Sequence, residues 1–195
     1  MDTYNIAYKD LLYIYNESIT DLTGINNFKY LKFLNIKNNP LSTFDITALN
    51  YLEDFNYSNS NLTNLDLSGN PNLEFLFCTD NLLETIDFSA SPNFGKLVAQ
   101  SNKFNTLDFT LNSELFLLKV DDNEITSLDL SMNPNLTYVA VQNNALNYLD
   151  ISNGENEKLT TFDANGNTGL SCIIVGNSTY MGANWGDTID ELLIY

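Results

Sequence analysis

Apolar residues recur along the chain at a constant spacing. The first apolar position of the recurring unit is held by Leu31, Leu52, Leu73, Phe94, Leu115 and Leu136, each 21 residues after the last, and then by Leu159 after 23. The unit reads L-x-x-L-x-L-x-x-N-x-L-x-x-L-D-L-S-x-N-P-x, as in residues 115–135. A unit this short cannot bury its apolar side chains alone, so the pattern predicts a solenoid of stacked coils.

The L-x-L segment of each unit predicts a short β-strand whose side chains alternate between core and solvent. Stacked coils place these strands side by side in one parallel sheet, and the rest of each unit turns back to bury its apolar columns against the next coil. We expect a sheet of about seven strands, roughly 30 Å long at the usual strand spacing. The fold should be mostly strand and loop, with little helix.

One asparagine per unit accompanies the apolar positions. The column consists of Asn39, Asn81, Asn102, Asn123, Asn144 and Asn167, and Ser60 takes the place of one member. An amide both donates and accepts hydrogen bonds, so inside a bend it can satisfy backbone groups of its own coil and of the adjoining one. We therefore predict a structural role for this column; direct ligand contact is the alternative.

The pattern from about residue 19 to residue 167 resembles the leucine-rich repeat family. Residues 19–25 are similar to the first repeat of internalin-like and of exported Bacteroidetes-type leucine-rich repeat proteins. The ending, with residues 170–175, Tyr180 and Trp185, resembles the terminal cap of the exported group, although Gly176 and Asn177 stand where that group has an Asp pair.

The resemblance implies a right-handed horseshoe of the α/β repeat type with a parallel concave sheet. It also implies a single domain: an N-terminal cap and first repeat in residues 1–30, repeats in 31–167 and a C-terminal cap in 168–195. Export is typical of these relatives, so we expect a bacterial protein that acts outside the cell or at its surface, with the cytoplasm as the alternative.

The charge balance excludes several classes of function. The chain has 8 basic and 25 acidic residues, a net charge of −17 and no His, and every cation is a Lys. Without Arg, and with a field that repels polyanions, binding to nucleic acid or to an anionic membrane is disfavoured. Without His there is no Ser-His-Asp system and no imidazole metal ligand. We predict no catalytic residues, no metal site and no cofactor.

Neither a membrane span nor a leader is visible in the sequence. The longest apolar run, residues 11–15, is far shorter than the roughly 20 residues that a spanning helix needs. The first residues lack the cationic start of a signal peptide, so either the protein stays inside the cell or the signal is encoded upstream.

An aspartate column follows the strand segments. Asp45, Asp66, Asp87, Asp108, Asp129 and Asp150 recur once per unit, each with Ser or Thr two residues later. Stacked like charges about 5 Å apart repel by roughly 0.8 kcal/mol even in water, so each carboxylate needs compensation. We predict that the carboxylates accept hydrogen bonds from turn N–H groups; a ladder of Ca²⁺ ions is the alternative.

The two cysteines lie far apart in the predicted solenoid. Cys78 and Cys172 are separated by five strand spacings, roughly 24 Å, whereas a disulfide needs Cα atoms within about 7 Å. We predict that both are reduced and act as small apolar fillers.

The strand alternation predicts which residues form the concave face. The candidate binding residues are Phe75, Phe77, Asp80, Lys96, Val98, Leu117, Lys119, Asp121, Asp122 and Tyr138. Aromatic anchors inside a polar rim are typical of a protein-binding surface. We predict a non-catalytic, monomeric module that binds a protein or a glycan on this face in bacterial surface adhesion or recognition.

Three alternatives remain open at this point. The chain could be a scaffold that assembles with other copies, or a targeting fragment of a larger protein. It could also be a hydrolase that pairs Asp80 with Asp121 or Asp122, although an open face has no enclosed pocket to raise the pKa of one acid.

Overall fold

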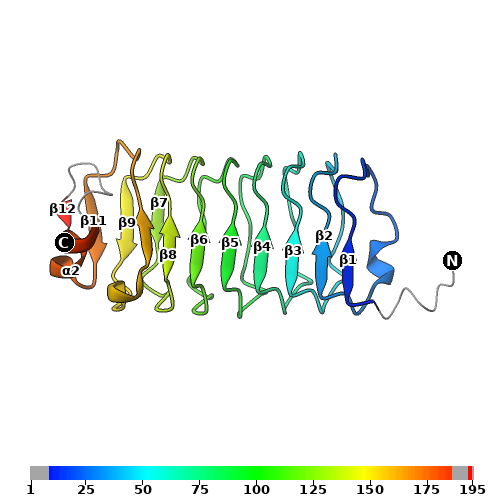
Figure 1. Ribbon diagram of the computed structural model, residues 1–195, viewed down its shortest axis with the longest axis horizontal. Helices are drawn as coiled ribbons and strands as arrows, with labels where there is room; N and C mark the ends of the chain where they lie inside the picture. Colours follow the sequence, from blue (N-terminus) through cyan, green and yellow to red (C-terminus); the bar gives the residue numbers. More distant parts are fainter. Residues whose placement is uncertain (1–8, 186–192, 195) are drawn as a thin grey trace.

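The computed structural model describes residues 9–185 together with residues 193 and 194. Its coils are stacked along the longest axis of the molecule, and each contributes one strand to a long parallel sheet (Figure 1). This sheet has eight strands in the order β1-β2-β3-β4-β5-β6-β8-β10. The strands are β1 (Leu11–Tyr13), β2 (Phe33–Asn35), β3 (Asp54–Asn56), β4 (Phe75–Phe77), β5 (Lys96–Val98), β6 (Leu117–Lys119), β8 (Tyr138–Ala140) and β10 (Thr161–Asp163).

The register of the sheet follows the sequence period. Equivalent residues of successive coils pair directly, as Phe75 does with Lys96 and Lys96 with Leu117. The sheet has one strand more than the roughly seven expected from the sequence, and β1 lies in residues 1–30, the segment predicted as the N-terminal cap and first repeat. Leu11 pairs with Phe33, so this segment is already a coil of the solenoid.

A second parallel sheet, which the sequence did not predict, forms from later segments of the C-terminal coils. It consists of β7 (Ser127–Asp129), β9 (Tyr148–Ile151), β11 (Cys172–Val175) and β12 (Leu193–Ile194), in the order β12-β11-β9-β7. In β7 the buried Leu128 lies between the exposed Ser127 and Asp129, so the L-D-L triplet of the repeat is extended enough here to form a ladder.

The core is a continuous column of apolar side chains that runs through the stacked coils. Leu31, Leu52, Leu73, Leu115 and their equivalents have no more than 4% of their surface exposed. Each coil packs against its two neighbours, which is why no coil has a core of its own.

The asparagine column is buried within this core, except for the partly exposed Asn144, and makes the predicted hydrogen bonds. Asn102 Nδ2 donates to Cys78 O at 2.9 Å in the preceding coil and to Ala99 O at 3.2 Å in its own. Its Oδ1 accepts the backbone N–H of Leu83 at 3.1 Å. Ser60, which replaces one asparagine, donates to Asn39 O at 2.9 Å. The predicted structural role is confirmed.

A second polar ladder that the sequence reasoning missed lies on the return side of the coils. Asn70, Asn112 and Asn133 are buried and donate to backbone carbonyls one coil back, as Asn112 does to Phe88 O and Ser91 O. These are the asparagines of the Asn-Pro position, so the repeat template did contain the signal.

Short helices lie near the two ends of the repeat array, η2 within its last repeats. The turns η1 (Ile25–Asn27) and η2 (Asn156–Lys158) are single 3-10 turns, and α2 (Ser178–Trp185) follows β11. Tyr180 and Trp185 pack against the core, and the Trp185 ring meets Phe162 edge-on at 6.4 Å. This is the arrangement expected of a C-terminal cap.

Candidate functional site

The outer side of the eight-stranded sheet, called the sheet face below, carries the predicted binding residues. Strand pairing arranges them in two adjacent rows. One row contains Phe75, Lys96, Leu117 and Tyr138, and the other contains Phe77, Val98, Lys119 and Ala140. All except the buried Ala140 are partly exposed. The structure therefore brings the predicted apolar residues and two lysines together on one surface.

An aromatic and a charged residue share the centre of this surface. Lys96 Nζ lies 4.7 Å from the centroid of the Phe77 ring, within the range of a cation–π contact. Asp54, on β3, is about half buried, and this burial raises the pKa of its carboxyl group, while the charge of Lys96 opposes the shift. The Asp54 carboxylate and the Lys96 ammonium thus attract each other beside the Phe77 ring.

The turn that follows each strand has a left-handed backbone. Asp80 and Asp122 have φ of 55° and 57°, and the equivalent positions of other coils are also left-handed, at Asn16, Asn38, Asn59, Ser101 and Asn143. Asn and Asp tolerate this conformation better than most residues, which agrees with the Asn, Asp or Ser found at this position of each coil. Both aspartates are exposed at the end of the sheet face, as expected for rim residues.

Asp121 differs from the expected rim position. Only 7% of its surface is exposed, and Gln100 Nε2 donates to its Oδ2 at 3.3 Å. Asp121 was expected on the outer face, but Gln100 and Gln142 occupy the same position in the coils on either side and are long enough to cover the shorter Asp121. The exposed carboxylates at this end of the face are therefore those of Asp122 and Asp80.

Sequence reasoning missed several residues of the sheet face. Tyr13, Phe33 and Asp54 extend it towards the N-terminus and, with Phe77, line a hollow of about 140 Å³. Phe116, the residue just before β6, was left out because it precedes the strand, yet its ring meets Phe75 edge-on at 6.2 Å. The position of Gly95 one coil earlier was the available signal, since a glycine there leaves room for a ring.

The aspartate column is satisfied by the backbone. Asp45 Oδ1 accepts the N–H of Thr47 at 2.8 Å, and the same bond recurs at each of the five later aspartates, ending with Ser152 N–H on Asp150 at 2.8 Å. Hydrogen bonds from Thr or Ser lower the pKa of Asp45, Asp66 and Asp87. The predicted turn role is confirmed. Within residues 9–185, 193 and 194, no group of three or more His, Cys, Asp or Glu side chains could hold a metal ion.

Both cysteines are free thiols, as predicted. Cys78 is fully buried beside Tyr57, and this burial raises the pKa of its thiol to about 12. A thiol that does not ionise near neutral pH is a poor nucleophile, in agreement with its role as an apolar filler.

Solved structures that resemble this chain are repeat solenoids. The functional domain of InlJ from Listeria monocytogenes superposes with a TM-score of 0.58 at 26% identity, over 89% of this chain and 50% of InlJ. Internalin C2 from Listeria monocytogenes gives 0.59 at 21% identity, over 90% of this chain and 84% of that one. The chain is a leucine-rich repeat protein.

The same fold occurs in a plant receptor ectodomain. The leucine-rich repeat ectodomain of GASSHO1/SCHENGEN3 from Arabidopsis thaliana, solved in complex with CASPARIAN STRIP INTEGRITY FACTOR 2, superposes with a TM-score of 0.62 at 19% identity, over 77% of this chain and 22% of that one. Searches against family models and against curated proteins give no match to the sequence. The leucine-rich repeat protein spans about half the length of the InlJ chain that it matches. None of the helices it forms in the described residues has the length and apolar character to cross a membrane.

Proposed function

We propose that this leucine-rich repeat protein is a non-catalytic module that binds a partner protein on its sheet face. The observation that carries the proposal is the contiguous apolar surface formed by Phe75, Phe77, Val98, Leu117 and Tyr138, which strand pairing holds in two rows. Rigid aromatic groups at the centre and charges at the edge are the composition of binding hot spots.

Charged residues lie both within this surface and along its border. Lys96 and Lys119 lie within the two rows, and Asp80 and Asp122 lie in the turns that follow the strands, along one side of the rows. Charges in contact with solvent set association rate and selectivity more than they set affinity, and salt screens them. Asp121 contributes little to this border because it is buried.

The proposal extends to location. The similarity to InlJ and to internalin C2 supports a role in recognition at the surface of a bacterial cell or outside it. The complex of the plant ectodomain with a factor supports a protein ligand. Since the chain spans about half of InlJ, the module is proposed as one part of a recognition system. Adhesion to another cell or surface is the specific role proposed for that system.

A peptide library tests the binding face even while the partner is unidentified. Displayed random peptides are selected on the folded protein, and the affinities of the selected peptides are measured for F77A/Y138A and for the control L82A/L111A. Leu82 and Leu111 are exposed leucines outside the two rows, with 38% and 64% of their surfaces exposed. We expect the F77A/Y138A variant to lose about 2 kcal/mol or more, which is roughly 30-fold, and the control to change by less than about twofold.

The opposite pattern contradicts the proposal. Peptides that bind F77A/Y138A as well as the parent protein, while that variant keeps its melting temperature, would place the binding surface elsewhere. Selection of no peptide, together with saturable binding of oligosaccharides on a glycan array, would favour the glycan ligand that the sequence left open. Concentration-dependent dimerisation that masks the sheet face would favour the scaffold.

A further inference from the structure

One hollow on the sheet face is built around a glycine. Its lining residues are Glu74, Phe75, Asn93, Gly95, Glu114 and Phe116, and its volume is about 330 Å³. The Phe116 ring lies against the backbone of Gly95, where an added Cβ would stand 3.0 Å from the ring. A larger residue at position 95 would push the ring away by a few tenths of an ångström, so the glycine favours this placement of the ring.

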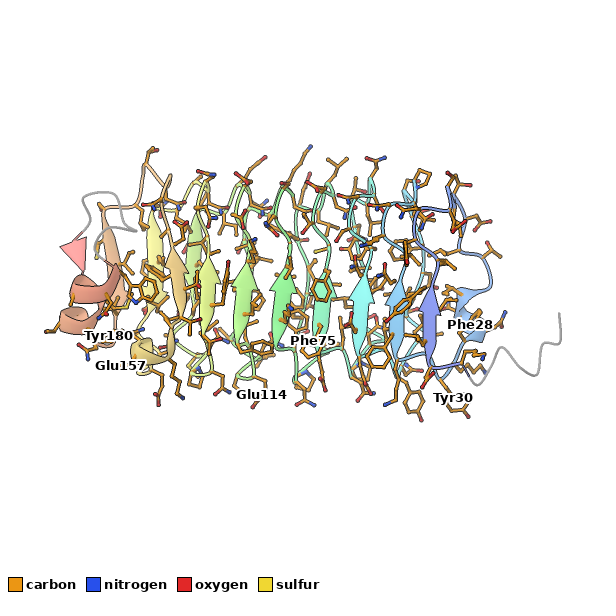
Figure 2. All side chains as sticks on the ribbon, viewed as in Figure 1. Phe28, Tyr30, Phe75, Glu114, Glu157 and Tyr180 are labelled. Atoms are coloured by element: carbon orange, nitrogen blue, oxygen red, sulfur yellow. The ribbon has the colours of Figure 1, made fainter. Side chains whose placement is uncertain are left out.

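Two aromatic rings form the apolar wall of the hollow. Phe116, which precedes β6, reaches across β5 and meets Phe75 of β4 with 6.2 Å between centroids and an interplanar angle of 85°. Figure 2 shows Phe75 on the lower part of the sheet face and Glu114 at the lower edge of the coils. The hollow is therefore continuous with the row that contains Phe75, Lys96 and Leu117.

The polar wall carries two carboxylates that form no ion pair within the described part of the chain. The ion pairs there are Lys32–Glu53 and Lys158–Glu155, and neither involves Glu74 or Glu114. Asn135 donates a long hydrogen bond of 3.4 Å to Glu114 Oε2. Because both carboxylates are exposed, they can approach a cation that enters the hollow.

The amide of Asn93 is also available, in contrast with its equivalents in other coils. Asn72 Nδ2 donates to Asn50 O at 2.7 Å, and Asn135 Nδ2 donates to Ser113 O at 3.2 Å. Within the described part of the chain, the Asn93 side chain makes no such bond. Both the Nδ2 and the Oδ1 of Asn93 are therefore without a partner among the described residues, and the Oδ1 can accept a hydrogen bond from a ligand in the hollow.

We infer that this hollow receives a lysine or arginine side chain of the partner protein. Aromatic faces attract cations, two carboxylates add charge-assisted hydrogen bonds, and the methylene stem of a long basic side chain covers the ring edges. The net charge of −17 attracts basic partners over a distance. The inference rests on the proposed function, because Phe75 belongs both to the hollow and to the sheet face, and it specifies the chemistry of the partner.

A basic peptide tests the inference directly. The ¹⁵N-labelled protein is titrated with hexalysine, and separately with hexalysine acetylated at every side chain, at about 150 mM NaCl so that attraction beyond roughly 8 Å is screened. We expect saturable amide shifts centred on Asn93, Gly95 and Phe116 with hexalysine alone. Acetylation removes the charge, so the neutral peptide should give no shifts in the hollow.

Matched variants separate the hollow from diffuse attraction. E74Q/E114Q removes the two carboxylates of the hollow, and E84Q/E124Q removes two exposed carboxylates elsewhere, so both variants change the net charge equally. We expect E74Q/E114Q to weaken hexalysine binding by more than about tenfold, and E84Q/E124Q to weaken it by less than about twofold. F116L, which removes the ring without a charge change, should also weaken binding.

Three results would overturn the inference. The first is an equal loss of binding in the two glutamine variants. The second is equal binding of the acetylated peptide. The third is a set of library-selected peptides that contain no Lys or Arg and yet lose affinity in F77A/Y138A; that outcome leaves the proposed function standing and removes the basic side chain from it.

Discussion

Lys96 Nζ lies 4.7 Å from the centroid of the Phe77 ring, so the ammonium of β5 covers part of an aromatic ring of β4. An exposed contact of this kind contributes about 0.5–1 kcal/mol. It holds the Phe77 ring in place at the surface, where the ring is available to a partner. The stability of the protein depends much more on the aromatic rings inside the core.

Phe77 and Phe55 provide a comparison of a surface ring with a core ring. Phe55 has no exposed surface, whereas Phe77 is partly exposed. We expect F77A to cost no more than about 1.5 kcal/mol of unfolding free energy, and F55A to cost roughly 3–5 kcal/mol through the cavity it leaves. Urea denaturation measures both. A loss for F77A as large as that for F55A would assign Phe77 to the core.

Replacing one ladder asparagine should destabilise several coils at once. N102A removes a donor to Cys78 O and Ala99 O and an acceptor for Leu83 N–H, all of them buried. Each buried group left without a partner costs about 1–3 kcal/mol, so we expect a loss of at least about 3 kcal/mol. N105A, at an exposed asparagine in the same coil, should change the stability by less than about 0.5 kcal/mol. Equal midpoints for the two variants would contradict a structural ladder.

Acidification should remove the stability that the aspartate turns give to the folded protein. Hydrogen bonds from Thr47, Ser68 and Ser89 lower the folded-state pKa of Asp45, Asp66 and Asp87 below the ordinary 3.8. A group with a lowered folded pKa stabilises the protein above its unfolded pKa, and that stabilisation is lost as the pH falls through the folded value.

The triple variant D45N/D66N/D87N isolates this effect. Asn keeps an acceptor oxygen for the turn N–H but cannot ionise. Protonation also relieves the repulsion within a chain of net charge −17, and that relief is nearly the same for both proteins. We therefore expect the urea midpoint of the parent to fall relative to that of the variant between about pH 5 and pH 2.5. A difference that does not change with pH would show that these turns do not depend on ionised carboxylates.

Calcium should have little effect on stability. The six carboxylates already accept backbone N–H groups, and the described residues offer no cluster for a metal ion. We expect melting temperatures in chelator and in about 5 mM Ca²⁺ to agree within roughly 2 °C. A larger shift that saturates with Ca²⁺ would instead support the ion ladder.

The C-terminal cap should be required for a monomeric fold. Met181 is fully buried, and Tyr180 and Trp185 cover the last coil beside Phe162. Removal of residues 171–195 exposes that coil and the edge of the second sheet, so we expect unfolding or aggregation by light scattering. The point variant T179A, at an exposed residue of the same helix, is the control and should stay monomeric.

The repeat pattern predicted the fold because the same residue types occupy the same structural positions in each coil. Leucine spacing indicated the strands and the core, asparagines indicated one ladder, and the Asp-x-Ser/Thr pairs indicated the turns. Features that depend on neighbouring coils of different composition were not predictable in this way. Asp121 is covered because two longer glutamines flank it, and the hollow at Gly95 exists because Phe116 follows one coil later.

The N-terminal strand and the second sheet were missed for another reason. The coil of β1 carries only part of the repeat template: Leu12 and Ile14 repeat the L-x-L positions of Leu34 and Ile36, but Lys9 and Glu17 stand in place of the first leucine and the ladder asparagine. β7 and β9 use the same L-D-L-like positions that are irregular in earlier coils, and β11 pairs with them. The repeat template is the same in coils with and without this second ladder, so it could not distinguish them.

The strand order of the larger sheet determines how the surface area of the molecule would change with the number of coils. In the larger sheet each strand pairs only with the strand of the coil before it and the coil after it. A globular domain gains volume faster than surface as it grows, but a column of constant cross-section adds the same exposed strip with every coil. Lengthening this protein by whole 21-residue units would therefore enlarge its sheet face in direct proportion to chain length, without any redesign of the interior.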